Sequence, residues 1–136
     1  MCVIDLDTVL NSTCLNDFGD AMRSYTNTGQ EDDENLDAVS CDLSIFEGFT
    51  KGYLSQTIGF LNEKELEFLA FSAKYITYEQ VLRFLMDYID GDKYYRIKSP
   101  EHNYQRTLAQ NKLLTSMEDQ YHEMCRIVRT VADKLS

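Results

Sequence analysis

The sequence lacks most of the features that mark easily recognised classes of protein. Only one of its 136 residues is a proline, and no apolar run approaches the length of about 18 residues that a membrane-spanning helix needs. It shows neither the charged and apolar regions of a secretory leader nor a linker rich in proline, glycine and serine. These absences favour a single cytoplasmic domain with no membrane partner.

Basic residues are also scarce. The chain has 13 Lys and Arg residues against 23 Asp and Glu residues, which gives a formal net charge of −10. Because gripping a phosphate backbone requires a basic surface, this balance argues against nucleic-acid binding. Residues 31–34 concentrate the acidic charge. They lack the alternating ligands and the glycine of a calcium loop, so we predict a solvated loop there.

Cysteine usage excludes two further classes. The four cysteines form no C-x-x-C pair, and the two histidines complete no zinc-binding pattern. The density of cysteines is also too low for a disulfide scaffold. We therefore expect free, mostly buried thiols in a reducing compartment. A glycine-rich phosphate-binding motif of the G-x-G-x-x-G or Walker A type is absent as well.

The hydrophobic pattern predicts a mainly α-helical fold, with one short N-terminal strand or hairpin followed by about four helices. The strand covers residues 3–6, where β-branched residues are enriched. The helices are predicted at residues 17–25, at residues 39–53, at residues 63–90, and in one long final segment that begins at Ser99–Pro100.

Several helix ends carry recognisable signals. Asn62 and Glu65 have the spacing of a capping box, and Gly91 is placed to end the third helix. Asn16 or Asp17 can cap the first helix, and Ser40 or Asp42 the second. The Ser-Pro pair predicts a cap followed by proline at the first helical position of the last helix.

Two carboxylates end the N-terminal apolar run. Asp5 and Asp7 are two positions apart, so a strand turns both side chains to the same side. Carboxylates on a rigid element are the ligands that phosphate-bridging cations such as Mg²⁺ prefer. On spacing alone, Asp5 can also be a strand-terminal residue that caps a turn.

A second acidic motif follows at residues 16–23. Asp17, Phe18 and Gly19 spell the D-F-G of protein kinases, but they lie where a helix begins. Asp20 and Arg23 are three positions apart, so they can form an ion pair on one face of that helix.

Arginine and tyrosine gather in residues 83–95. Planar donors for hydroxyl groups and aromatic faces for the apolar side of a ring are typical of sugar sites. Arg83 can instead form an ion pair with Asp87, four positions later on the same helix. His102, at a helix start, is expected to act as a cap or to contact solvent rather than to serve as a catalytic base.

These segments resemble kinase-like phosphotransferases, the group that contains aminoglycoside phosphotransferases and choline kinase, and the closest resemblance is to N-acetylhexosamine 1-kinases. The resemblance spans nearly the whole chain. It is carried by the strings V-I-D-L-D at residues 3–7, N-D-F-G-D-A-M-R at residues 16–23, R-F-L-M-D-Y-I-D-G-D-K-Y-Y at residues 83–95 and P-E-H-N at residues 100–103. It implies the C-terminal portion of a kinase-like C-lobe that works with ATP and Mg²⁺. The implied reaction is phosphorylation of an N-acetylhexosamine at its anomeric hydroxyl.

The resemblance also implies roles for single residues. Asp5 corresponds to the metal ligand, and Asp17 to an aspartate that accepts hydrogen bonds from the catalytic-loop backbone. Asp7, Arg83 and Tyr94 correspond to residues that contact the sugar.

The family's catalytic loop, H-x-D-x-x-x-x-N, and its nucleotide-binding N-lobe are not found in this sequence. No catalytic residue is therefore assigned, and residues 1–136 alone are expected to be inactive. The N-terminal strand, lacking its sheet partners, is expected to be exposed and to promote self-association.

Two alternatives stay open. The chain can derive from a kinase of the same superfamily that acts on choline, an aminoglycoside or homoserine, or it can be a non-catalytic helical module that binds a partner. Sulfatase chemistry is not supported, because Pro100 does not stand in the required C/S-x-P-x-R context.

Overall fold

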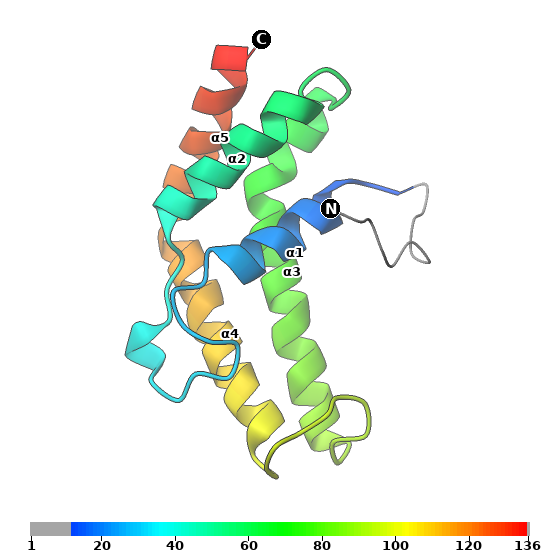
Figure 1. Cartoon of the computed structure of the whole chain (residues 1–136). Helices are drawn as coiled ribbons and strands as arrows, with labels where there is room; N and C mark the ends of the chain where they lie inside the picture. Colours follow the sequence, from blue (N-terminus) through cyan, green and yellow to red (C-terminus); the bar gives the residue numbers. More distant parts are fainter. Residues whose placement is uncertain (1–11, 136) are drawn as a thin grey trace, which may run out of the picture.

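The computed structural model describes residues 12–135, and these form five α-helices and one short 3₁₀ helix (Figure 1). The mainly α-helical prediction is confirmed, whereas the predicted strand at residues 3–6 lies outside the described residues. The helices are α1 (Leu15–Tyr25), η1 (Leu36–Ala38), α2 (Leu43–Thr57), α3 (Glu63–Ile89), α4 (His102–Asp119) and α5 (Tyr121–Leu135).

Helix α3, 27 residues long, is the element on which the others assemble. Figure 1 shows α1 crossing α3, α4 running beside the lower half of α3, and α5 continuing upward from α4 toward α2. The core lies between these helices and is built from fully buried apolar side chains: Phe18, Met22, Phe46, Leu54, Leu69, Ala73, Leu113, Met117 and Met124. One long helix thus connects the lower, α4-packed half of the molecule with the upper, α5-packed half.

The caps of α2 and α3 form as predicted. The Asn62 side chain accepts a hydrogen bond from the backbone N–H of Glu65 (3.0 Å), and the Glu65 carboxylate accepts one from the backbone N–H of Asn62 (2.9 Å). Asp42 caps α2 by accepting from the backbone N–H groups at the second and third positions after it. Helix α3 ends at Ile89, and Gly91 follows with a φ of +86°, a conformation that favours glycine.

The start of α1 differs from the prediction. The helix begins at Leu15 with Cys14 at the cap position, so the expectation of Asn16 or Asp17 as the cap is wrong. The hydroxyl of Thr13 accepts a hydrogen bond from the backbone N–H of Leu15 (3.3 Å). Because Thr13 satisfies a backbone N–H group at Leu15, the helix can start one or two residues before the predicted caps at Asn16 and Asp17.

The predicted long final helix is two helices. The helical backbone is interrupted at Gln120. The side-chain amide of Gln120 donates to the carbonyl oxygen of Cys41 (3.0 Å) and to that of Ser116 (3.2 Å). The first of these helices begins at His102 rather than at Pro100, and the carbonyl oxygen of Ser99 accepts the His102 backbone N–H (3.1 Å). The interruption changes the direction of the chain, and α5 then packs against α2.

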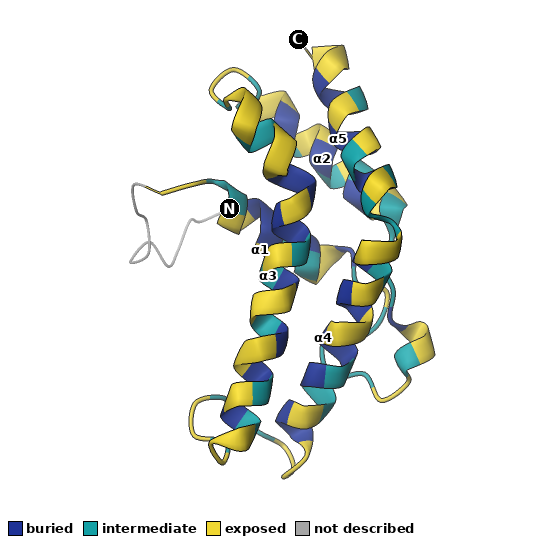
Figure 2. Ribbon diagram, turned by 180° about the vertical axis from the view of Figure 1, so that it is seen from behind, coloured by how far each residue is buried: buried dark blue, intermediate teal, exposed yellow. Residues whose placement is uncertain are grey.

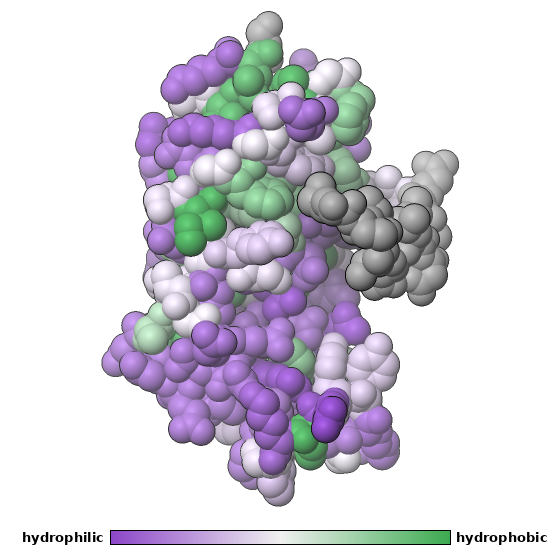
Figure 3. Space-filling view, in the orientation of Figure 1, coloured by the Kyte–Doolittle hydropathy of each residue, from purple (hydrophilic) through white to green (hydrophobic). Residues whose placement is uncertain are grey.

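The lower and upper halves of the molecule also differ in the hydropathy of their surface. Figure 3 shows a largely hydrophilic lower half, where the loop after α1 meets the start of α4, and more hydrophobic residues in the upper half. No helix within residues 12–135 is both long enough and apolar enough to cross a membrane.

Candidate functional site

Arg83 and Tyr94, which the sequence assigns to one site, lie close together in the structure. The guanidinium carbon of Arg83 is 5.9 Å from the ring centre of Tyr94 and 5.8 Å from that of Tyr95. Both distances lie at the outer limit of a cation–π contact. Arg83 Nη1 is also 4.0 Å from a carboxylate oxygen of Glu79, on the preceding turn of α3. The arginine is thus held loosely on the surface, with donors left for a ligand.

A shallow pocket of about 330 Å³ opens beside these residues. This volume is at the lower end of the range for small-molecule sites. Tyr94 is 75% exposed, so its ring is available to a ligand. Tyr95 is fixed, since its ring packs on Phe84 (4.8 Å between centres) and its hydroxyl accepts from the Gln80 amide (3.2 Å). The pocket is lined by Arg83, Met86, Asp87, Asp90, Tyr94 and Tyr95.

Asp87 holds the loop that carries the two tyrosines. Its buried carboxylate accepts hydrogen bonds from the backbone N–H groups of Lys93 (2.9 Å), Tyr94 (2.8 Å) and Tyr95 (2.9 Å). The alternative role of Arg83, an ion pair with Asp87, is therefore wrong. Both carboxylate oxygens are occupied by the loop, and Arg83 reaches back toward Glu79 instead.

Asn103, on the first turn of α4, completes this arrangement. Its buried amide group donates to Asp87 (2.8 Å) and to Asp92 (2.8 Å), and its carbonyl oxygen accepts from Arg106 (3.0 Å). Asp92 has a φ of +56°, which non-glycine residues rarely adopt. Asn103 therefore ties a strained turn to two helices at once.

The electrostatics of Asp87 follow from these bonds. Burial alone would raise the pKa of its carboxyl group, but the N–H groups of Tyr95, Tyr94 and Lys93, together with Asn103, lower that pKa below its ordinary value. The carboxylate form is thus the one that the loop stabilises.

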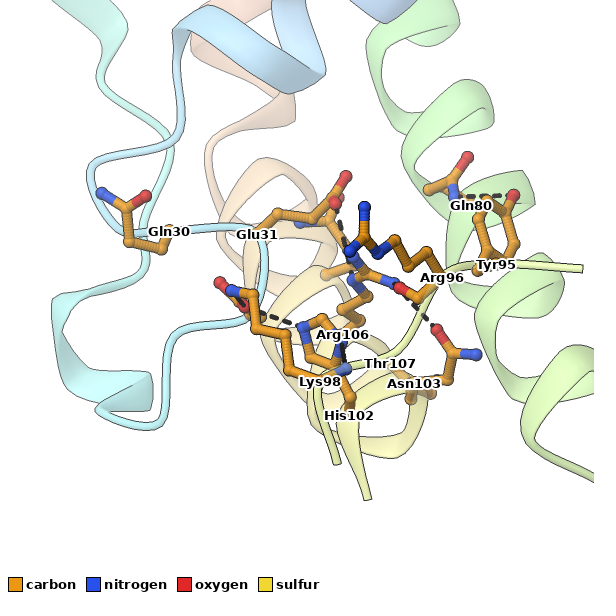
Figure 4. Close-up of polar contacts among 12 residues, drawn as sticks. Gln30, Glu31, Gln80, Tyr95, Arg96, Lys98, His102, Asn103, Arg106 and Thr107 are labelled. Carbon is orange, nitrogen blue, oxygen red and sulfur yellow. Dashed lines mark hydrogen bonds and ion pairs between the residues drawn. The ribbon is translucent and has the colours of Figure 1, made fainter. Parts of the chain in front are cut away.

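A second polar network lies beside the first and joins the acidic loop to α4. Asp32 accepts hydrogen bonds from the side chain of Lys98 (2.6 Å) and from Nε2 of His102 (2.8 Å). Nδ1 of His102 accepts from the backbone N–H of Lys98 (3.1 Å). Figure 4 shows Lys98, His102 and Arg106 gathered around the loop that carries Glu31. Lys98 and His102, in that order of effect, lower the pKa of Asp32 to about 2.

This network corrects the expectation for His102. The ring is buried rather than in contact with solvent. Because Nδ1 accepts a hydrogen bond, the ring proton lies on Nε2 and points at Asp32. No nitrogen lone pair is left for a substrate proton.

The acidic segment at residues 31–34 is likewise more than a solvated loop. Glu31 forms ion pairs with Arg23 of α1 (3.0 Å) and Arg106 of α4 (3.7 Å), and only Glu34 of the four residues is exposed. The predicted loop is confirmed, but it is only partly solvated, because cationic side chains of α1 and α4 hold it.

The other predicted site residues are spread over the chain. Asp17 lies in the first turn of α1 and is exposed, and the expected Asp20–Arg23 ion pair is confirmed at 3.2 Å. Asp5 and Asp7 lie outside the described residues. The structure therefore brings Arg83 and Tyr94 together, with Asp17 on a different helix.

Residues 12–135 hold three cysteines and no cluster of metal-ligating side chains. In that part of the chain, no three His, Cys, Asp or Glu side chains come together in a way that could hold a metal ion. Cys14, Cys41 and Cys125 are free thiols, and burial raises the pKa of Cys41, which makes it less reactive. No protein-family model matches the sequence.

Proposed function

We propose that the chain is the C-terminal part of the C-lobe of an ATP-dependent sugar phosphotransferase, and that the pocket beside Arg83 and Tyr94 contributes to sugar binding. The observation that carries this proposal is the meeting of these two residues at one pocket, since the resemblance to N-acetylhexosamine 1-kinases assigns both to the sugar. The proposed activity is transfer of a phosphoryl group from ATP to the anomeric hydroxyl of an N-acetylhexosamine.

The chemistry of the pocket suits a pyranose ring. A guanidinium group offers several donors in one plane, which matches neighbouring hydroxyl or carbonyl acceptors. The exposed Tyr94 ring offers a face for the apolar side of the sugar, and Tyr95 provides a fixed edge. Because the pocket is shallow, further residues are needed to enclose a sugar, and Asp7 is our candidate for one of them.

The remaining roles are assigned as follows. Asp5 would hold Mg²⁺, which would neutralise the charge that develops on the transferred phosphoryl group. Asp17 would support the catalytic-loop backbone. A general base is not assigned to any of these 136 residues, because the motif that supplies it is not in the sequence. We therefore expect no turnover of N-acetylglucosamine or N-acetylgalactosamine by this chain alone.

The test is an NMR titration of the isotope-labelled chain with N-acetylglucosamine and N-acetylgalactosamine. We expect millimolar binding, as a partial site implies, with shifts at the Tyr94 and Tyr95 amides and the Arg83 guanidinium. Arg83→Ala should abolish the shifts, while Arg129→Ala, which removes an exposed arginine on α5, should preserve them.

Two outcomes would count against the proposal. Shifts that persist in the Arg83→Ala variant would place the sugar elsewhere. Shifts caused by choline, an aminoglycoside or homoserine, but not by either sugar, would favour a related kinase with a different substrate.

A further inference from the structure

Helix α3 carries a stripe of large apolar residues on its solvent-facing side. The spacing alternates strictly between three and four positions. Leu85 is half-buried, and the other six residues range in exposure from 38% for Leu82 to 71% for Ile89. We call this stripe the α3 seam, and it consists of Phe68, Phe71, Tyr75, Tyr78, Leu82, Leu85 and Ile89.

The α3 seam lies opposite the face that forms the core. Leu69, Ala73, Thr77 and Phe84 are buried against the other helices, and helical periodicity places them on the far side of α3 from the seam. Figure 2, the view from behind, shows exposed residues recurring along the whole length of α3. No element within residues 12–135 covers this face.

The seam is an ordered surface rather than a set of isolated side chains. The rings of Phe68 and Phe71 meet edge to face with 5.9 Å between centres, and Tyr75 stacks on Phe71 at 6.3 Å. Single exposed apolar residues are ordinary, but a continuous stripe of this length on a helix marks an interaction surface.

The period of the seam defines the geometry of its partner. A repeat of 3.5 residues is the signature of a coiled coil, in which a second helix packs at a small left-handed crossing angle. Phe68, Tyr75, Leu82 and Ile89 then take the a positions, and Phe71, Tyr78 and Leu85 take the d positions. The expected partner is therefore another helix with the same apolar repeat.

The charged residues beside the seam indicate that the partner helix is α3 of a second copy of the chain. In this register Lys74 is at a g position and Glu79 at the following e position. When two copies of α3 pack parallel and in register, each g residue faces the e residue five positions later in the other copy. Lys74 of each copy then faces Glu79 of the other, giving two ion pairs by symmetry. The other g and e positions of α3 hold Glu67, Ser72, Val81 and Met86. Ser72 and Val81 are buried within their own chain, and no like charges meet.

We propose that the α3 seam is the interface of a homodimer in which two α3 helices pack parallel and in register. Within one copy, Lys74 lies over the ring of Tyr121 (4.3 Å) and Glu79 is 4.0 Å from Arg83. Both contacts involve flexible side chains that can turn toward a second copy. The proposal does not rest on sugar binding or on any kinase activity, although Met86 borders both the seam and the pocket.

The first experiment measures the mass of the chain in solution by sedimentation equilibrium over a range of micromolar concentrations. We expect twice the 15.8 kDa of the monomer. Phe71→Glu should give a folded monomer, with its helical circular dichroism retained. Ile45→Glu, which changes an exposed apolar residue on α2, should remain a dimer. A monomeric wild type, a dimeric Phe71→Glu variant, or equal dissociation by Ile45→Glu would overturn the proposal.

The second experiment tests the parallel register. Lys74→Glu and Glu79→Lys should each raise the dissociation constant of the dimer about tenfold, because two attractive pairs become repulsive. The double variant that exchanges both charges should recover the wild-type constant. Loss of the Tyr121 contact cannot mimic this recovery, since the contact is missing in the double variant too. A double variant no tighter than the single ones would rule out the parallel pairing.

Discussion

Gly19 of α1 lies directly against the backbone of Ser72 in α3. A Cβ atom on Gly19 would be 2.5 Å from the carbonyl oxygen of Ser72 and 2.6 Å from Cγ1 of Ile76. These distances leave no room for any side chain, so the crossing of α1 over α3 depends on glycine at this position. The oxygen belongs to a helical backbone and cannot move aside as a flexible side chain would.

The first prediction concerns this crossing. Gly19→Ala should destabilise the fold by about 1–3 kcal/mol, because overpacking forces the two helices apart. Gly48 and Gly52 of α2 are matched controls, since each is exposed and a Cβ there would meet nothing within 4 Å. Alanine at either should stabilise α2 by about 0.5–1 kcal/mol. Urea denaturation measures all three, and a Gly19→Ala protein as stable as the controls would contradict the described packing.

The second prediction concerns the loop that carries Tyr94 and Tyr95. Asp87→Asn should lower the melting temperature, because an amide NH₂ cannot accept the N–H groups that the carboxylate holds. Amide exchange at Lys93, Tyr94 and Tyr95 should accelerate. Asp90→Asn removes an exposed carboxylate near the same helix end and should leave their exchange unchanged. Equal effects of the two variants would show that loss of a negative charge at this helix end, and not loss of the hydrogen bonds to the loop, accelerates the amide exchange.

The third prediction concerns pH. The pKa of Asp32 falls from an ordinary 3.8 to about 2 in the fold, so folding favours its charged form. Its contribution to stability is therefore complete above the ordinary pKa and is lost as the pH falls toward 2. The difference in free energy of unfolding between wild type and Asp32→Asn should shrink over that interval. A difference that stays constant over that interval would contradict this role of Asp32.

The fourth prediction concerns the contact between α4 and the segment before α2. The Ser116 hydroxyl accepts a hydrogen bond from the backbone N–H of Cys41 (3.0 Å), which is buried. Ser116→Ala should cost about 1–3 kcal/mol by leaving that N–H unpaired. Thr115→Ala is the control, because its exposed hydroxyl bonds only to its own helix. Chemical denaturation distinguishes the two, and a near-neutral Ser116→Ala would mean that the N–H finds another acceptor.

The sequence predicted well those features that depend on neighbouring residues. The capping box of α3, the Asp42 cap and the end of α3 before Gly91 all rest on side chains within a few positions of the backbone they contact. The division of the last helix was missed, because it involves Gln120 and Cys41, which are 79 positions apart. Spacing along one helix gives no information on such a contact.

The candidate site shows the same limit. The resemblance placed Arg83 and Tyr94 in one site, and they do lie together, although their role in binding stays a prediction. The function of Asp87 as a loop anchor was missed, since ion-pair spacing with Arg83 offered a simpler explanation. A useful signal was present: a carboxylate one turn before a Gly-Asp pair can accept the N–H groups of the turn that follows. The His102–Asp32 contact spans 70 positions and gave no local signal.

The packing of α2 on α5 has a consequence for the order in which the protein folds during synthesis. Helices α1 and α3 are separated in sequence by α2, but they contact each other directly and can dock as soon as α3 leaves the ribosome. Helix α2 emerges before α3, yet part of its core face waits for α5, which is made after every other described helix. Until then the apolar side of α2 stays partly uncovered, and this nascent stage is the one most exposed to aggregation and to capture by chaperones.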